Sequence, residues 1–237
     1  MQCFFSLTIG VYGQGTEEKT KIISTALDNT ISFYKEAAGA QLRLYNGSVY
    51  EGYRYAFKNG NPYFFKKEAD IGSVFYDGVF YKNIPLRYDL LRDKVIIEHA
   101  DEATQVSLVR EKIGYFTLYN HTFIYLSVDS TLNTSLTVGF YDQLYQGQVT
   151  LLAKRAVKMQ QRTLPSGVER TLLPQVKYYI KQNGAYYPVK SHRTLLKLFK
   201  EKKKALQKFA RENKIGAQDN PEEAMIKLTA YYNSLKN

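Results

Sequence analysis

Short apolar runs alternate with turn residues between Val49 and Val128. The clearest example is residues 73–82 (SVFYDGVFYK), where an Asp-Gly pair separates two apolar triplets. Such a pair favours a type I′ turn, because both of its residues tolerate positive φ. We expect a hairpin that is apolar on both faces and therefore covered on both sides. Phe75 and Phe80 would lie on one face, and the other face would carry Val74, Tyr76, Val79 and Tyr81.

Further apolar runs follow at the spacing of about 8–12 residues that is typical of antiparallel sheets. No helix-length segment separates them, which argues against a parallel sheet. Residues 162–174 contain Pro165, Gly167 and Pro174 and are expected to form a mobile loop. A last hairpin over 177–189 carries Pro188, which has no amide to donate and therefore favours a sheet edge. The other strands are expected at 49–57, 63–66, 86–91, 95–99, 106–110, 115–118, 122–128, 138–144 and 148–157.

Helical periodicity marks both ends of the chain. Apolar residues recur at three- and four-residue spacing over 16–38, which predicts an N-terminal helix. Residues 191–237 predict a helical hairpin that joins near Gly216, with Ser191 as the cap of its first helix and Asn220 as the cap of its second. The apolar face of this hairpin needs cover, and the sheet is the nearest candidate.

The sequence therefore predicts a β-rich α+β fold in a single domain over residues 14–237. An antiparallel meander over 49–189 would form a curved sheet or half-barrel, with the N-terminal helix and the C-terminal helical hairpin packed on it. Residues 1–13 are apolar and uncharged and are expected to be an export signal peptide; the alternative is a buried N-terminal strand. The single cysteine, Cys3, excludes an internal disulfide and a cysteine-based zinc site.

The net charge of +11 is concentrated in one segment. Residues 190–214 contain ten basic and two acidic residues, so the rest of the chain carries only +3. The segment could be a solvated helix face, a peripheral contact with an anionic membrane surface, or a nucleic-acid contact. Lysine predominates, which favours diffuse charge, and export would remove most nucleic-acid partners; we do not expect nucleic acid. The predicted basic surface comprises Lys197, Lys200, Lys203, Lys204 and Lys208.

Three stretches of the chain carry a resemblance. Residues 44–53 (LYNGSVYEGY), 72–89 (GSVFYDGVFYKNIPLRYD) and 177–181 (KYYIK), with the helix sequence LLKLF at 195–199, resemble uncharacterised exported proteins of the Bacteroidota. The resemblance covers roughly residues 44–235. It implies a periplasmic or secreted location in a bacterial cell envelope, and it implies no activity and no catalytic residues.

Few residues suggest chemistry. The sequence has no Gly-x-Gly-x-x-Gly, P-loop, Gly-x-Ser-x-Gly or His-Glu-x-x-His motif, and its three histidines are dispersed, so no cofactor or metal is expected. Glu98, Asp101 and Glu102 could supply paired carboxylates for acid–base catalysis or simply form a polar turn. Asp89 could be a buried orienting group or an exposed residue. Ser130, in a predicted exposed loop, lies in an Asp-Ser-Thr triplet that resembles an O-glycosylation pattern.

The leading hypothesis is a non-enzymatic, exported envelope module that binds a ligand or partner. A curved sheet covered by a helix can enclose an apolar cavity for a lipid or other apolar ligand. The many tyrosines fit a half-exposed sheet or a stacking platform for bases or sugars. Alternatives are a hydrolase of envelope polymers that uses the acidic cluster or His121, and an assembly protein whose edge hairpin recruits a strand. The predicted ligand-binding residues are Phe75, Tyr76, Phe80, Tyr81, Tyr115 and Tyr125.

Overall fold

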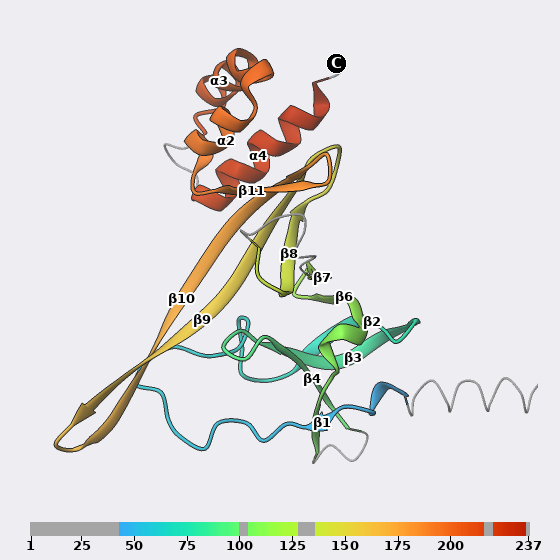
Figure 1. The fold of residues 1–237 in the computed structure, drawn as a ribbon, viewed down its shortest axis with the longest axis vertical. Coiled ribbons are helices and arrows are strands. Elements are labelled where there is room, and N and C mark those ends of the chain that lie inside the picture. The colour runs from blue at the N-terminus through green and yellow to red at the C-terminus, as the bar shows by residue number, and fades with distance from the viewer. Residues whose placement is uncertain (1–42, 100–103, 128–135, 216–219, 236–237) are drawn as a thin grey trace, which may run out of the picture. The chain divides into compact units, whose positions relative to one another are not determined.

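The computed structural model describes residues 43–99, 104–127, 136–215 and 220–235. The compact unit Leu44–Asn237 contains an eleven-stranded antiparallel sheet that is curved but not closed (Figure 1). This confirms the predicted fold class. The predicted export signal, Cys3 and the N-terminal helix lie outside the described residues. The strands are β1 (Ser48–Val49), β2 (Asp70–Tyr76), β3 (Val79–Asp89), β4 (Lys94–Glu98), β5 (Gln105–Ser107), β6 (Ile113–Leu118), β7 (His121–Leu126), β8 (Gly139–Tyr145), β9 (Thr150–Leu164), β10 (Gly167–Gln182) and β11 (Ala185–Val189).

The strand order is β1-β5-β4-β3-β2-β6-β7-β8-β9-β10-β11. Two meanders therefore meet in the middle of the sheet: β2 to β5 proceed toward one edge, and β6 to β11 proceed toward the other. The short 3₁₀ turn η1 (Arg110–Lys112) lies between β5 and β6, and β6 pairs with the free side of β2. The amide of Asp77 donates to the carbonyl oxygen of Lys112 at 2.9 Å, which joins the β2–β3 turn to η1.

The central hairpin has the predicted register. Val74 pairs with Tyr81, and Phe75 pairs with Phe80. Asp77 and Gly78 both have positive φ, at 50° and 80°, as the predicted turn requires. The prediction that this hairpin is covered on both faces is wrong, because Phe80 is 42% exposed. On this outer face, Tyr115 stacks on Phe75 with ring centres 5.7 Å apart.

The expected loop over 162–174 is also wrong, since β9 and β10 form one continuous long hairpin with its turn at residues 165–166. Pro174 is tolerated within β10 because β11 pairs only with Tyr178–Gln182, so β10 has no second neighbour at Pro174. Conversely, the strands expected at 49–57 and 63–66 do not form. Between Val49 and residue 66 the backbone makes only two isolated β-bridges, one between Asn59 and Thr171 and one between Tyr63 and Asp89.

The last hairpin forms as β10 and β11, with Tyr178 opposite Val189 and Tyr179 opposite Pro188. As predicted from Pro188, β11 is an edge strand.

The C-terminal helices are α2 (His192–Leu198), α3 (Lys203–Glu212) and α4 (Pro221–Ser234), with a 3₁₀ turn η2 (Lys200–Lys202) between the first two. Both predicted caps are present: Ser191 Oγ accepts from the amide of Thr194, and Asn220 Oδ1 accepts from the amide of Glu223. The expected continuous first helix is interrupted at Phe199 (φ −88°, ψ 55°), whose buried ring stacks on Tyr232 at 3.8 Å. The predicted joint at Gly216 lies outside the described residues.

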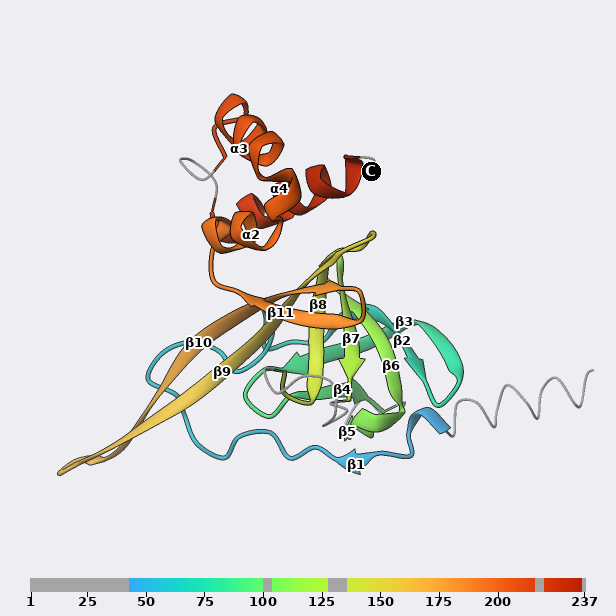
Figure 2. The same cartoon turned by 45° about the horizontal axis from the view of Figure 1, so that its top comes forward.

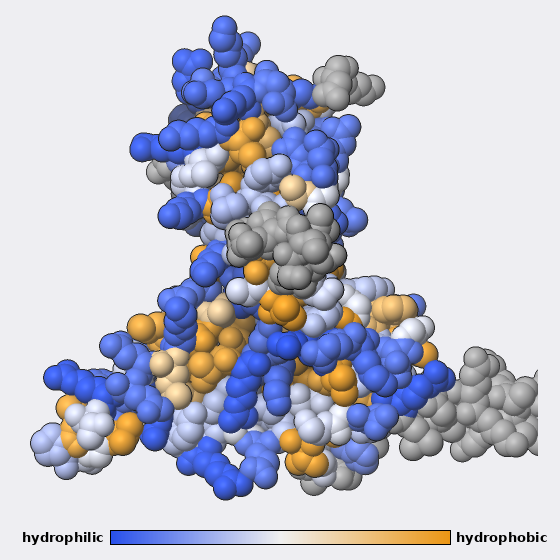
Figure 3. Space-filling view, viewed as in Figure 1, coloured by the Kyte–Doolittle hydropathy of each residue, from blue (hydrophilic) through white to orange (hydrophobic). Residues whose placement is uncertain are grey.

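The helices pack on one end of the sheet, formed by β8, β9, β10 and β11 (Figure 2). Hydrophilic side chains cover much of their outer surface (Figure 3). Buried side chains of the sheet and the helices share one core, which confirms that the tail packs on the sheet. Its members are Val149, Leu151, Ile180, Val189, Leu195, Phe199, Leu206, Ile215, Ala224, Met225, Leu228 and Tyr232.

A second core of aromatic rings fills the space between β3 and β6–β8. Phe116 stacks on Phe123 at 4.8 Å, and Tyr88 contacts Phe116, Phe123 and Phe140 edge to face. All four residues are at most 1% exposed. The chain's own rings therefore pack against one another on this face of the sheet.

Candidate functional site

Residues 50–63 connect β1 to the rest of the sheet with irregular backbone, and they carry a cluster of aromatic side chains. Two of its hydroxyl groups donate to the buried carboxylate of Asp89, and a third contacts one of these hydroxyls. Tyr50 donates to Asp89 Oδ2 at 2.7 Å, Tyr53 donates to the same oxygen at 2.7 Å, and the hydroxyl of Tyr63 lies 3.1 Å from that of Tyr50. The irregular segment is thus fastened to the end of β3 by its own tyrosines.

Asp89 is fully buried and also organises the β3–β4 turn, because its Oδ1 accepts from the amides of Leu91 and Arg92 at 2.9 Å. Hydrogen bonds of this kind, from several donors to one carboxylate, are among the stronger ones in proteins. Burial, with the hydrogen bond to Asp89, raises the pKa of the Tyr53 hydroxyl well above its ordinary value. Burial, followed by the hydrogen bonds with Tyr63 and Asp89, does the same for the pKa of Tyr50. Both hydroxyls therefore remain donors to Asp89 at neutral pH.

Two guanidinium groups lie over these rings. Arg92 lies 4.1 Å from the ring centre of Tyr53, and Arg87 lies 4.7 Å from that of Tyr63. Arg87 also donates to the carbonyl oxygen of Lys67 at 2.8 Å. Cation–π contacts of this type add to the stability of the cluster and fix the planes of its rings.

The outer side of the cluster is an open cleft of about 410 Å³. Its floor is formed by the partly exposed rings of Tyr53, Tyr55 and Phe57, whose centres lie 5.1–5.8 Å apart. Strand β10 supports it from behind, where the guanidinium of Arg170 lies 4.3 Å from the ring of Tyr55. The lining consists of Tyr53, Tyr55, Ala56, Phe57, Gly60, Asn61, Pro62, Tyr63 and Lys67.

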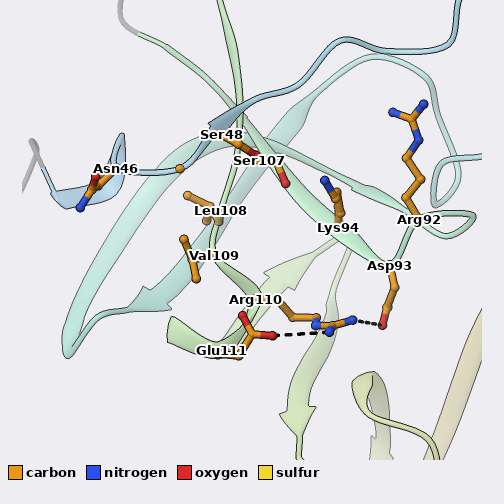
Figure 4. Close-up of a pocket in the computed structure, with 11 residues that line it drawn as sticks. Asn46, Ser48, Arg92, Asp93, Lys94, Ser107, Leu108, Val109, Arg110 and Glu111 are labelled. Atoms are coloured by element: carbon orange, nitrogen blue, oxygen red, sulfur yellow. Dashed lines mark hydrogen bonds and ion pairs between the residues drawn. The ribbon is translucent and has the colours of Figure 1, made fainter.

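Two further pockets continue from this aromatic cleft. The first, of about 470 Å³, shares Tyr55 with the cleft and is also lined by Arg92 and Lys94. The second, of about 430 Å³, again includes Arg92 and Lys94 (Figure 4). Neighbouring pockets share lining residues, and all three lie along residues 46–63; we refer to them together as the track. The pocket in Figure 4 is lined by Asn46, Gly47, Ser48, Arg92, Asp93, Lys94, Ser107, Leu108, Val109, Arg110 and Glu111.

Asp93 is the acidic centre of the pocket in Figure 4. It accepts hydrogen bonds from Tyr88 and from Lys154, the latter at 2.9 Å, and lies 3.8 Å from Arg110. Arg110 in turn lies 3.4 Å from Glu111. Burial lowers the pKa of Lys154, although the Asp93 carboxylate opposes the shift. The negative charge of Asp93 is therefore neutralised by groups of the chain itself.

The six predicted ligand-binding residues separate into different places. Phe75, Phe80 and Tyr115 form a partly exposed aromatic group on the outer face of β2, β3 and β6. Tyr76 and Tyr81 are buried, on the opposite face of the same hairpin. Tyr125 packs on Phe140 with ring centres 5.6 Å apart.

The other predicted residues lie apart from the track. His121 Nδ1 lies 2.8 Å from Asp142, and three strands separate β7 from β4, which carries Glu98. Asp101, Glu102 and Ser130 lie outside the described residues. The basic surface is exposed as expected, with Lys208 lying 3.8 Å from Glu212. Its other members are Lys197, Lys200, Lys203 and Lys204.

Comparison with protein-family models, with curated proteins and with solved structures finds no match. No helix in the described part of the chain is long and apolar enough to cross a membrane. The same described residues contain no group of three or more His, Cys, Asp or Glu side chains that could hold a metal ion.

The pH dependence of folding can be predicted from the tyrosines that bind carboxylates. Burial, with the hydrogen bond to Glu222 at 2.9 Å, raises the pKa of Tyr178 to about 12. A raised pKa in the folded state means that its stabilising effect is complete below the unfolded value near 10 and is lost as the pH rises toward 12. We expect urea unfolding to show a falling free energy of unfolding over this range, less steeply in Tyr178→Phe. The exposed control Tyr187→Phe should behave as the unaltered protein; an unchanged slope in Tyr178→Phe would contradict the assignment.

Proposed function

We propose that the protein is a non-enzymatic binding module of the cell envelope that holds a segment of a polysaccharide in the aromatic cleft. The observation that carries the proposal is the floor of partly exposed rings, Tyr53, Tyr55 and Phe57, in an open cleft of about 410 Å³.

Sugar rings have the surface that such a cleft complements. A pyranose presents an apolar face of C–H groups and a rim of hydroxyls, and aromatic rings pack against the apolar face. Asn61 and Lys67 lie at the edge of the cleft and offer an amide and an ammonium group to the hydroxyls. A few polar groups around an apolar floor are typical of small-molecule sites.

Preorganisation of the segment also supports a binding role. Irregular segments of this length in compact domains are commonly functional. Here the Asp89 network fixes residues 50–63 before any ligand arrives, so little side-chain freedom is lost on binding.

The carboxylate of Asp89, which Tyr53 binds, suits holding the site together rather than hydrolysing a substrate. Hydrolysis of a glycosidic bond commonly uses two carboxylic groups that reach the substrate. Asp89 is fully buried and has hydrogen bonds from two tyrosines and two backbone amides. This favours binding over catalysis.

Binding to soluble polysaccharides, measured by isothermal titration calorimetry, tests the proposal. Stacking of a nucleic-acid base on an aromatic ring contributes about 1–3 kcal/mol, and we expect two sugar-stacking rings to contribute at least the lower value together. Tyr55→Ala with Phe57→Ala should therefore weaken binding at least about tenfold. Tyr187→Ala removes a tyrosine that is 40% exposed on β11 and should bind normally. Circular dichroism and urea unfolding check that both variants fold. Unchanged binding in the double variant, or no binding to any polysaccharide by the unaltered protein, would overturn the proposal.

A further inference from the structure

Building on the proposed function, we infer that the polysaccharide is acidic, and that Lys94 and Arg92 bind its anionic groups beyond the aromatic cleft. The inference concerns the two pockets that continue from the cleft, where these two residues line both.

The track has the right continuity for a polymer. Tyr55 belongs both to the aromatic cleft and to the neighbouring pocket, so a chain stacked on the rings passes directly to Arg92 and Lys94. Beyond them, the pocket in Figure 4 adds the hydroxyls of Ser48 and Ser107. Figure 4 shows Lys94 between Ser107 and Arg92. These groups are all hydrogen-bond donors for an anionic oxygen.

The carboxylates of the track already have partners. Glu51 pairs with Arg54 at 2.5 Å, and Asp93 pairs with Lys154 at 2.9 Å. Glu111 lies 3.4 Å from Arg110. Within the described part of the chain, by contrast, Arg92 and Lys94 form no ion pair with any carboxylate. In the two pockets beyond the cleft, these two cations are therefore the charges that remain for a ligand.

Arg92 is held in position before binding. One of its terminal nitrogens donates to the carbonyl oxygen of Gly52 at 3.0 Å, and its guanidinium lies 4.1 Å from the ring centre of Tyr53. The plane of the guanidinium is thus fixed, and its other N–H groups are oriented without further loss of side-chain freedom. Planar recognition of an anionic group is the characteristic use of arginine.

The spacing of charge favours an acidic polysaccharide over a single-stranded nucleic acid. A nucleic acid carries a phosphate at every unit and is bound in grooves of continuous positive charge. Here Glu51, Asp93 and Glu111 lie among the cations of the same track. A polymer whose charges are spaced by uncharged rings and hydroxyls fits this alternation better.

The test compares three probes with the full chain at low and high salt: a polyuronate, the neutral glucan dextran and an oligothymidylate. We expect the polyuronate to bind most tightly and to weaken as salt is added, because partly exposed charges are screened. Lys94→Glu should weaken polyuronate binding about tenfold while changing dextran binding less than about twofold. Lys94 is exposed and takes no part in the Asp89 hydrogen bonds, so this variant should fold. Lys204→Glu makes the same charge change on α3 and should leave polyuronate binding within about twofold.

Each contrary result has its own meaning. Equal binding of polyuronate and dextran, abolished by Tyr55→Ala with Phe57→Ala, would overturn this inference and leave the proposed function intact. Absence of binding to both sugars would overturn the proposed function and the inference with it. Tighter binding of oligothymidylate would replace the acidic polysaccharide by a nucleic acid. If Lys94→Glu and Lys204→Glu weaken polyuronate binding equally, the net charge of the chain, rather than this site, attracts the ligand.

Discussion

Replacing Asp89 by Asn is expected to lower the free energy of unfolding by about 2–4 kcal/mol, because a buried network loses its charged acceptor. The carboxylate accepts from Tyr50, Tyr53 and the amides of Leu91 and Arg92. An asparagine can keep its one acceptor oxygen for the amides of Leu91 and Arg92, but its NH₂ group then faces the hydroxyls of Tyr50 and Tyr53. Those hydroxyls lose their charged acceptor, and each must turn to accept from the amide and find another acceptor for its own proton.

Urea unfolding followed by circular dichroism measures this change, and Asp77→Asn is the matched control. Asp77 undergoes the same chemical substitution at a partly exposed turn with φ 50°, a conformation that asparagine tolerates, and its ion pair with Lys112 is partly exposed. We expect the control to change stability by less than about 1 kcal/mol. Equal stability of the two variants would mean that the Asp89 network does not hold the cleft.

The same substitution connects stability to function. If Asp89 keeps residues 50–63 in place, Asp89→Asn should expose this segment to limited proteolysis while the sheet stays folded. Polysaccharide binding should weaken with it, since the rings of the cleft would no longer be fixed before the ligand arrives.

Local turn chemistry explains what the sequence could predict. The registers of the hairpins at Asp77-Gly78 and Asn183-Gly184 follow from the two turn residues and the flanking alternation alone. The caps at Ser191 and Asn220 are equally local. The fold class follows from these elements, because many short strands without long crossovers leave few other architectures.

Prediction failed where distant contacts decide the structure. Pro174 suggested a loop, but at this position β10 has β9 as its only neighbour, so a missing amide costs nothing. The apolar run after Val49 is typical of a strand. In the structure, the hydrogen bonds from Tyr50 and Tyr53 to Asp89 hold this run in an irregular backbone conformation. Nothing in the local sequence specifies which strand lies beside β2.

The candidate site was missed for the same reason. The aromatic residues at 50, 53, 55 and 57 were assigned to a strand, although their spacing is not strictly alternating and Gly52 interrupts them. That irregular spacing was the available signal. The possibility that Asp89 is a buried orienting group is confirmed, since its side chain is fully buried and fixes two tyrosines.

Replacing Arg155 by Met is expected to destabilise the fold by about 3–5 kcal/mol, because it removes the guanidinium that pairs with the buried carboxylate of Asp142 and leaves His121 beside that carboxylate. Arg155 donates to Asp142 and to Glu222 of α4, each at 2.7 Å. The side chain of Asp142 is only 1% exposed, and its Oδ1 already has no hydrogen-bond partner within the described residues. Arg155 therefore neutralises the charge of Asp142 in the interior of the sheet and connects the first turn of α4 to β9.

A double variant separates the loss of the ion pair from the loss of packing. In Arg155→Met with Asp142→Leu both charges are gone, so we expect most of the lost stability to return, as is found when buried ion pairs are replaced by apolar residues. The matched control is Arg54→Met, which removes an arginine from a pair that is 82% and 68% exposed and should change stability by less than about 1 kcal/mol. Urea unfolding of all three proteins provides the comparison. If the double variant is no more stable than Arg155→Met, the arginine acts through its packing and its contact with Glu222, and charge neutralisation of Asp142 is not its main contribution.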